Sequence, residues 1–340
     1  MGKLNIIKNF APSWFASVMG TGILAITSLF YSQYILSLKY VAIGLFYLNV
    51  ILFFVLLVPW LLRWLLFRKQ ALADLEHPVT SNFYATIAIG MLVLSADFIV
   101  INRNFLIGEI FWFAGTFLTI LFAVITPYIM FKGEHVKLDH INPAWFIPPV
   151  GLIVIPIAGG LLINRYSGAI KELVIFLNYF GWGAGFLLYI SLCAICMYRF
   201  IMHTPLPETL APTVWINLGP IGAGTTALIN LIKNTSFITF KEPFFIFGMI
   251  LWGYGVWWVI MAILLTLNYI RNVRLPYALS WWAFTFPLGA YVSASHSIAG
   301  IFELGIIDIF GFCLYLLLFL FWSITSIKTL KAAYSGELFG

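Results

Sequence analysis

Residues 9–38 read NFAPSWFASVMGTGILAITSLFYSQYILSL, thirty residues without a Lys, Arg, Asp or Glu. An α-helix needs about 20 mainly apolar residues to cross the hydrocarbon core of a bilayer, which is roughly 30 Å thick. Nine further charge-free runs of at least 19 residues follow: 40–62, 77–96, 110–131, 140–164, 173–198, 209–232, 243–270, 275–302 and 309–327. The chain is therefore predicted to be an all-α integral membrane protein with ten transmembrane helices.

The composition points to the same class. Of the 340 residues, 9% are charged and 62% are hydrophobic, and the mean hydropathy is +1.02. Soluble domains average about 25% charged residues, so this composition excludes a soluble globular enzyme and a disordered protein. Three Cys residues provide neither a disulfide framework nor a zinc site. The expected partner is the lipid bilayer, with no nucleic acid, no metal and no cofactor.

The short loops between the runs set the expected orientation. Twelve Lys and Arg residues fall at the two termini and in every second loop, against six on the opposite side. Because Lys and Arg are enriched in cytoplasmic loops, both termini are expected in the cytoplasm and the protein in the plasma membrane. The loops have no P-loop motif and no room for a catalytic domain, which argues against ATP-driven transport by this chain alone.

Similar sequences recur at the starts of alternate runs. Residues 12–16 (PSWFA), 143–147 (PAWFI), 212–216 (PTVWI) and 279–283 (LSWWA) match one another, and the run that starts at 78 matches more loosely. The starts near 12, 78, 143, 212 and 279 are 65 to 69 residues apart, enough for two spans each. This spacing predicts five helical hairpins within a single transmembrane domain, residues 1–340.

Residues that disturb helices are concentrated in the first helix of each hairpin. Eight residues into each repeat, and close to that point, stand Gly20, Gly22, Thr86, Gly151, Pro220 and Pro287. Interrupted helices are tolerated in membranes where neighbours or a water-filled path satisfy the freed backbone groups. The pattern favours an inner ring of five helices around a central pore, with the other five facing lipid. The alternative is that small residues only serve close helix packing.

The predicted inner helices carry hydroxyls and no Lys or Arg. Such a lining binds ions weakly, which suits conduction because an ion must also leave. Hydroxyl donors and a basic inner mouth favour anions over cations. This preference is weak, because carbonyls freed by Pro220 and Pro287 would favour cations.

Four strings carry a family resemblance: residues 11–22 (APSWFASVMGTG), 76–79 (EHPV), 217–220 (NLGP) and 280–289 (SWWAFTFPLG). In these strings and their order, essentially the whole chain resembles the tellurite-resistance/dicarboxylate transporter family. That family includes malate permeases, sulfite efflux pumps and the slow anion channels of plants. The resemblance implies a ten-helix protomer with a central pore, usually in a homotrimer.

The resemblance also implies a gate and a function. The family's pore is blocked by a Phe within an aromatic-Thr-Phe-Pro string, which Phe284 to Pro287 match, so Phe286 is the expected aromatic plug. The expected function is transport of small anions, either a C4-dicarboxylate such as malate or monovalent inorganic anions. A proton-coupled dicarboxylate symporter and a sulfite exporter remain alternatives.

Four ionisable residues are candidates for further roles. His296, well inside a run, and Asp97 and Glu303, near the ends of runs, are candidates for proton coupling, because ionisable groups within membranes are often functional. Each has a plainer interpretation as a packing or interfacial residue. His77, beside Pro78, is expected to cap its helix or to face a cytoplasmic vestibule.

An integral-membrane enzyme is the rival class. Haem ligation across a helix bundle would need a second intramembrane His besides His296, and a metalloprotease would need a His-Glu-x-x-His string that this sequence lacks. The residues therefore favour a transporter over an enzyme.

Overall fold

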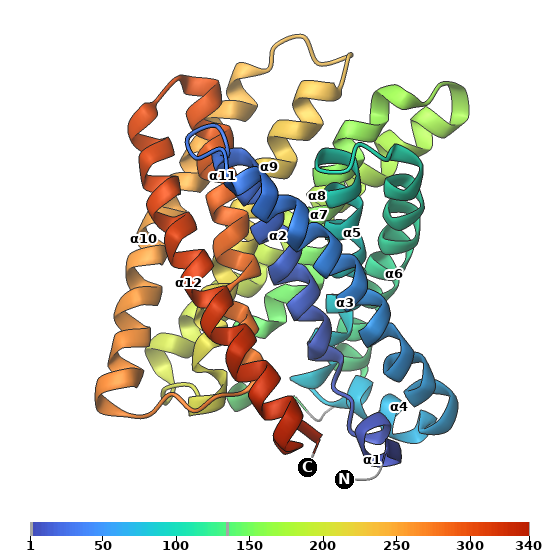
Figure 1. Cartoon of the computed structure of the whole chain (residues 1–340), viewed down its shortest axis with the longest axis vertical. Helices are drawn as coiled ribbons and strands as arrows, with labels where there is room; N and C mark the ends of the chain where they lie inside the picture. The colour runs from blue at the N-terminus through green and yellow to red at the C-terminus, as the bar shows by residue number, and fades with distance from the viewer. Residues whose placement is uncertain (1–2, 134–135, 340) are drawn as a thin grey trace.

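The computed structural model of the chain describes residues 3–133 and 136–339, and helices are its only regular secondary structure over these residues. Five long helices alternate with five shorter ones, and both termini lie at the same end of the bundle (Figure 1). The long helices are α3 (Leu38–Leu66), α6 (Phe105–Lys132), α8 (Gly168–Met202), α10 (Glu242–Asn272) and α12 (Gly305–Ser335). The short helices are α2 (Ala16–Tyr31), α5 (Ala85–Val100), α7 (Ile147–Leu162), α9 (Leu218–Asn234) and α11 (Phe286–Phe302). Smaller elements are α1 (Lys3–Lys8), α4 (Arg68–Glu76), η3 (Leu138–His140), η5 (Ile163–Arg165) and η8 (Glu337–Phe339).

A 3₁₀ segment precedes each short helix. These segments are η1 (Pro12–Phe15), η2 (Thr80–Tyr84), η4 (Pro143–Phe146), η6 (Glu208–Asn217) and η7 (Leu279–Phe284). The short α-helices have 16 or 17 residues, so at 1.5 Å per residue they reach only about 25 Å. The 3₁₀ turns, which rise about 2.0 Å per residue, supply much of the length needed to cross a bilayer.

The short helices form a closed ring. In order, α2 packs against α5, α5 against α7, α7 against α9, α9 against α11, and α11 back against α2. Each short helix also packs against the long helix that follows it in the chain. The long helices surround this ring, with α10 and α12 at one side and α3 and α6 at the other in Figure 1.

Burial separates the two helix classes as a membrane requires. In the most apolar windows of the segments containing α2, α5 and α7, 78–89% of the residues are buried, against 22–39% in the long helices. The exposed residues of the long helices are mainly Leu, Ile, Val, Phe and Tyr. An apolar outer surface of this extent is stable in lipid and not in water.

Eight helical segments are long and apolar enough to cross a membrane: Pro12–Tyr31, Leu38–Leu66, Thr80–Val100, Phe105–Lys132, Pro143–Arg165, Gly168–Met202, Glu242–Asn272 and Gly305–Ser335. An all-α membrane protein is thus confirmed, but the predicted count of ten spans is met by eight segments only. The runs 209–232 and 275–302 contain α9 and α11. The first is rich in Gly, Thr and Asn, and the second is interrupted at Thr285, where η7 has ended and α11 has not begun.

Candidate functional site

The break at Thr285 shapes the centre of the ring. Its backbone lies at φ −99°, ψ −73°, and its hydroxyl donates a 2.7 Å hydrogen bond to the Trp282 carbonyl. Gly20 of α2 lies against this break, and a Cβ at Gly20 would overlap the Thr285 side chain. The missing side chain therefore lets α2 approach α11 where α11 begins with Phe286 and Pro287.

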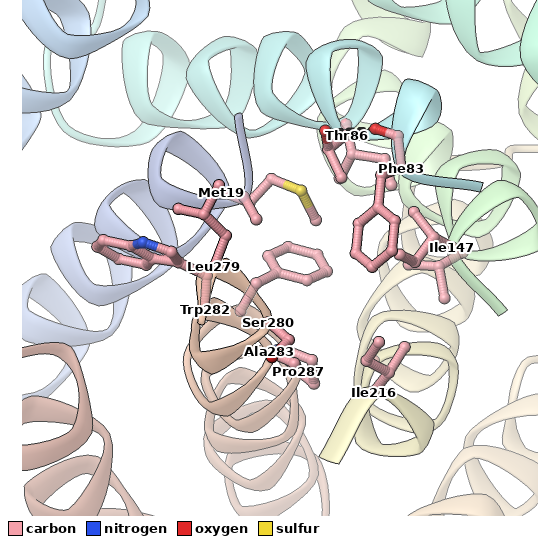
Figure 2. Close-up of a pocket in the computed structure, with 15 residues that line it drawn as sticks. Met19, Phe83, Thr86, Ile147, Ile216, Leu279, Ser280, Trp282, Ala283 and Pro287 are labelled. Carbon is pink, nitrogen blue, oxygen red and sulfur yellow. Dashed lines mark hydrogen bonds between the residues drawn. The ribbon is translucent and has the colours of Figure 1, made fainter. Parts of the chain in front are cut away.

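A first cavity of about 40 Å³ lies inside the ring, beside the 3₁₀ segments. All five short helices or their 3₁₀ segments line it, and Figure 2 shows side chains from several of these elements turned towards one space. The side chains labelled there are Met19, Phe83, Thr86, Ile147, Ile216, Leu279, Ser280, Trp282, Ala283 and Pro287. This lining is almost wholly apolar, and its two hydroxyls, on Thr86 and Ser280, donate to backbone carbonyls.

A second cavity of about 90 Å³ lies further along the same five helices, towards the end opposite the termini. Its lining is mainly Ile, Leu, Val and Ala, with four polar side chains: Thr226, Asn230, Ser293 and Ser297. The Asn230 amide donates to the Ile157 carbonyl at 2.9 Å. The Thr226 hydroxyl has no hydrogen-bond partner among the described residues although it is buried. A rotation of this side chain would turn its free hydroxyl towards an ion in the cavity.

Phe286 is the one residue that lines both cavities among those the structure describes. Its side chain is 4% exposed, and it is the first residue of α11 after the break. Phe286 therefore stands between two cavities that lie along one ring of helices. A bulky apolar side chain at such a constriction excludes water and hydrated ions.

Both cavities lack charge. None of the described residues that line them is Lys, Arg, Asp, Glu or His. No group of three or more His, Cys, Asp or Glu side chains in residues 3–133 and 136–339 is placed to hold a metal ion. The arrangement offers an ion weak, neutral contacts and no strong binding site.

Of the helix-disturbing residues predicted around a pore, the structure places two on a cavity wall. Thr86 and Pro287 line the first cavity. The Thr86 hydroxyl donates to the Pro12 carbonyl at 2.9 Å and so connects α5 to η1. Gly20 and Pro220 are buried and line neither cavity.

The remaining two glycines serve contacts between helices. A Cβ on Gly22 would meet Val93 and the carboxylate of Asp97. A Cβ on Gly151 would come within 3.0 Å of the Thr119 side chain on α6. Both residues face neighbouring helices rather than the cavities, which the sequence pattern did not distinguish because pore-lining and packing glycines share the same spacing.

Asp97 is fully buried behind the ring. Its Oδ2 accepts a 3.1 Å hydrogen bond from the Asn49 amide of α3, and its Oδ1 has no partner within the described chain. Asp97 lines neither cavity, although Val93 and Ala96 of the same helix line the second. The carboxyl thus joins a short helix to a long one.

His296 belongs to a polar cluster at the end of the ring opposite the termini. Its Nδ1 lies 3.0 Å from Asp308 Oδ1, and its ring stacks on Phe30, which lines the second cavity. The Tyr34 hydroxyl donates to the other Asp308 oxygen at 2.5 Å. Sequence reasoning missed Asp308, although its position directly before the last charge-free run was a usable signal.

Glu303 and His77 lie at opposite ends of the bundle, and neither lines a cavity of the ring. Glu303 is exposed and ends α11 in a left-handed conformation, φ 55°. His77 is also exposed, and its Nδ1 accepts from the backbone N–H groups of Val79 and Thr80 at 3.2 Å each. His77 therefore caps the turn into η2.

Residues 9–330 match the model of the voltage-dependent anion channel (SLAC1) family. The chain belongs to the voltage-dependent anion channel family. Membership confirms the resemblance seen in the four sequence strings, and it makes the protein a member of a channel and transporter family rather than of an enzyme family.

Curated relatives cover nearly the whole chain. An uncharacterised transporter of Methanocaldococcus jannaschii is 61% identical over 99% of this chain and 97% of its own length. A sulfite efflux pump of Arthroderma otae is 27% identical over 98% of this chain and 93% of its own length. A malic acid transport protein of Schizosaccharomyces pombe is 21% identical over 98% of this chain and 80% of its own length.

Proposed function

We propose that the protein conducts small anions through the ring of short helices and that Phe286 is the gate. The observation that carries the proposal is the position of Phe286 between the two cavities, as the one residue lining both in the described chain. Opening requires the phenyl group of Phe286 to turn out of the line that joins the two cavities. The irregular backbone at Thr285 supports this role, because it separates Phe286 at the start of α11 from the preceding 3₁₀ segment.

Monovalent anions fit the lining better than dianions. The cost of removing an ion from water grows with the square of its charge, and neither cavity contains a cation to repay that cost. Free hydroxyls such as that of Thr226 compensate a single negative charge with hydrogen bonds. Chloride or a singly charged oxyanion such as hydrogen sulfite is therefore the preferred substrate class, and a malate dianion is the next candidate.

Replacement of Phe286 by Ala tests the gate. In planar bilayers, anion conductance of Phe286→Ala is expected to rise at least about tenfold, which corresponds to a barrier lowered by about 1.4 kcal/mol. The control is Phe284→Ala. Phe284 is equally buried but lines neither cavity, and its ring packs against Trp215, Trp281 and Phe321. Unchanged current in Phe286→Ala, or an equal rise in both variants, would remove the gate assignment.

A panel of anions tests the substrate. Proteoliposomes containing Phe286→Ala are given chloride, sulfite at a pH where hydrogen sulfite predominates, or malate, each with and without a pH gradient. Passive conduction predicts flux that follows the anion gradient alone, with malate slowest. Flux that collapses without a proton gradient would favour the symport alternative.

The membrane arrangement is part of the same proposal. We infer ten spans in five hairpins within one domain, residues 1–340, with α9 and α11 completing the ring alongside the eight apolar segments. The excess of Lys and Arg in the terminal segments and every second loop supports an orientation with both termini in the cytoplasm, and we propose the plasma membrane as the location. A homotrimer, which the family resemblance implies, predicts a protein mass of three times 38.4 kDa in native mass spectrometry.

A further inference from the structure

A groove of about 380 Å³ lies on the outside of the bundle, between the ends of α8 and α10. Its lining shares no residue with either cavity of the ring. It lies where α8 ends and α10 approaches its own end, the end of the bundle that carries both termini (Figure 1). The transport pathway therefore does not account for this groove.

Arg199 supplies the polar end of the groove. Its side chain is only 2% exposed, and Nη1 donates to the Thr204 carbonyl at 3.0 Å. Its Nε has no partner, and it forms no ion pair with any described carboxylate. Asp139 lies nearby but pairs with His203 at 3.2 Å. A buried guanidinium without a paired carboxylate is costly in a membrane protein, and a phosphate bound at its accessible edge would supply the missing negative charge.

The rest of the groove is an apolar wall along one face of α10. Trp257, Met261, Leu265 and Asn268 line it and follow one another at helical spacing. From Trp257 to Asn268 the helix rises about 16 Å, close to the thickness of one leaflet of the hydrocarbon core. Trp257 is 44% exposed, so its ring is open to a neighbouring chain of lipid.

We propose that this groove binds one anionic phospholipid of the adjacent leaflet. The phosphate contacts the Arg199 guanidinium, and an acyl chain lies along Trp257 and Met261 towards the membrane centre. The length of the apolar wall favours a phospholipid over free phosphate, which would use the Arg199 end alone. An anionic headgroup is preferred because a choline group would bring a second cation close to Arg199 and His203.

Fluorescence quenching by brominated lipid tests the proposal. The purified full-length protein is delipidated in detergent and titrated with phosphatidylglycerol or phosphatidylcholine carrying brominated acyl chains. The part of the quenching that disappears in Trp257→Phe reports contact at Trp257 alone. We expect saturable quenching at Trp257, with phosphatidylglycerol binding about tenfold more tightly than phosphatidylcholine, and no competition from inorganic phosphate.

Two variants test the contributions of the Arg199 charge and of the apolar wall separately. Arg199→Gln is expected to weaken phosphatidylglycerol binding about tenfold, whereas Arg271→Gln, which removes an exposed Arg of α10 at the same end, leaves it unchanged. Met261→Phe narrows the groove, keeps Arg199 and adds no new indole, so it is expected to reduce quenching at Trp257 even if Arg199→Gln fails to fold.

Three results would overturn the proposal. Equal affinity of Arg199→Gln and the wild type would remove the phosphate contact. Competition by millimolar inorganic phosphate, with no dependence on the acyl chain, would make the groove an anion site. Absence of quenching in the wild type, together with a change of oligomeric mass in Met261→Phe, would assign the groove to a second copy of the chain.

Discussion

The short helices of the ring and the long helices around it are built from similar apolar residues, yet they tolerate change differently. A side chain added to the ring meets another helix: a Cβ on Gly222 of α9 would overlap the backbone of Ala290 and Tyr291 in α11. A Cβ on Gly253 of the long helix α10 would meet nothing within 4 Å. At this contact between α9 and α11 the ring has no room for a side chain, whereas there is room on the surface of α10 at Gly253.

Matched glycine substitutions give the largest expected contrast between the two classes. Gly222→Ala forces two helix backbones apart, and we expect it to lower the free energy of unfolding by at least about 3 kcal/mol. Gly253→Ala is expected to stay within about 1 kcal/mol of the wild type, on the stabilising side, because Ala favours helix more than Gly. Unfolding of the detergent-solubilised variants in increasing SDS measures both. A similar loss in the two variants would contradict the difference in packing.

Matched hydroxyl substitutions give an intermediate effect. Thr226 and Thr116 are both buried with unpartnered hydroxyls, but Thr226 lines the second cavity whereas Thr116 of α6 lines neither. Each is replaced by Val in the Phe286→Ala background, where flux is large enough to measure. Thr226→Val is expected to reduce chloride flux about five- to tenfold, which corresponds to the free energy of about one lost hydrogen bond. Thr116→Val is expected to leave the flux unchanged. Equal flux in the two variants would show that the ion does not contact Thr226.

The smallest expected effect concerns the carboxyl that joins the two helix classes. Asp97 of α5 bonds to Asn49 of α3 and has no surface on either cavity. Asp97→Asn keeps the shape and offers a donor to the unpartnered Asn49 Oδ1. We expect the anion flux of Asp97→Asn to stay within about twofold of the flux of the same protein with Asp97, because the lost charge does not contact the ion. Loss of pH-gradient-driven uptake in Asp97→Asn, with passive flux intact, would instead make Asp97 a proton-coupling group.

The sequence predicted the membrane fold well because long charge-free runs have few other physical solutions. The repeated Pro-x-Trp-Phe strings coincide with 3₁₀ segments such as η1 and η4, a geometry that the strings alone did not reveal. Gly and Pro were sound markers of the buried helices, but they did not distinguish Pro287 on a cavity wall from Gly151 at a helix interface. That distinction depends on which way each helix is rotated, and rotation is set by packing between helices that are distant in sequence.

The polar groups were harder to predict for a similar reason. Thr226 and Thr116 look alike in sequence, and only the ring places one of them in a cavity. Asp308 stands next to a charge-free run, and its partners His296 and Tyr34 lie on α11 and beyond the end of α2. Contacts between such distant segments are decided by the assembled bundle, so a single sequence indicates the residue types and not the pairs.

The ring closes where α11 meets α2, and this contact joins the last short helix to the first. During synthesis the first four hairpins emerge before the residues that complete the wall, so no enclosed pathway exists until the final hairpin is inserted. Phe286 stands at the start of that final short helix. Under the proposed function, the segment that completes the pathway also carries its gate, so a chain that lacks the final hairpin cannot enclose an ungated pathway.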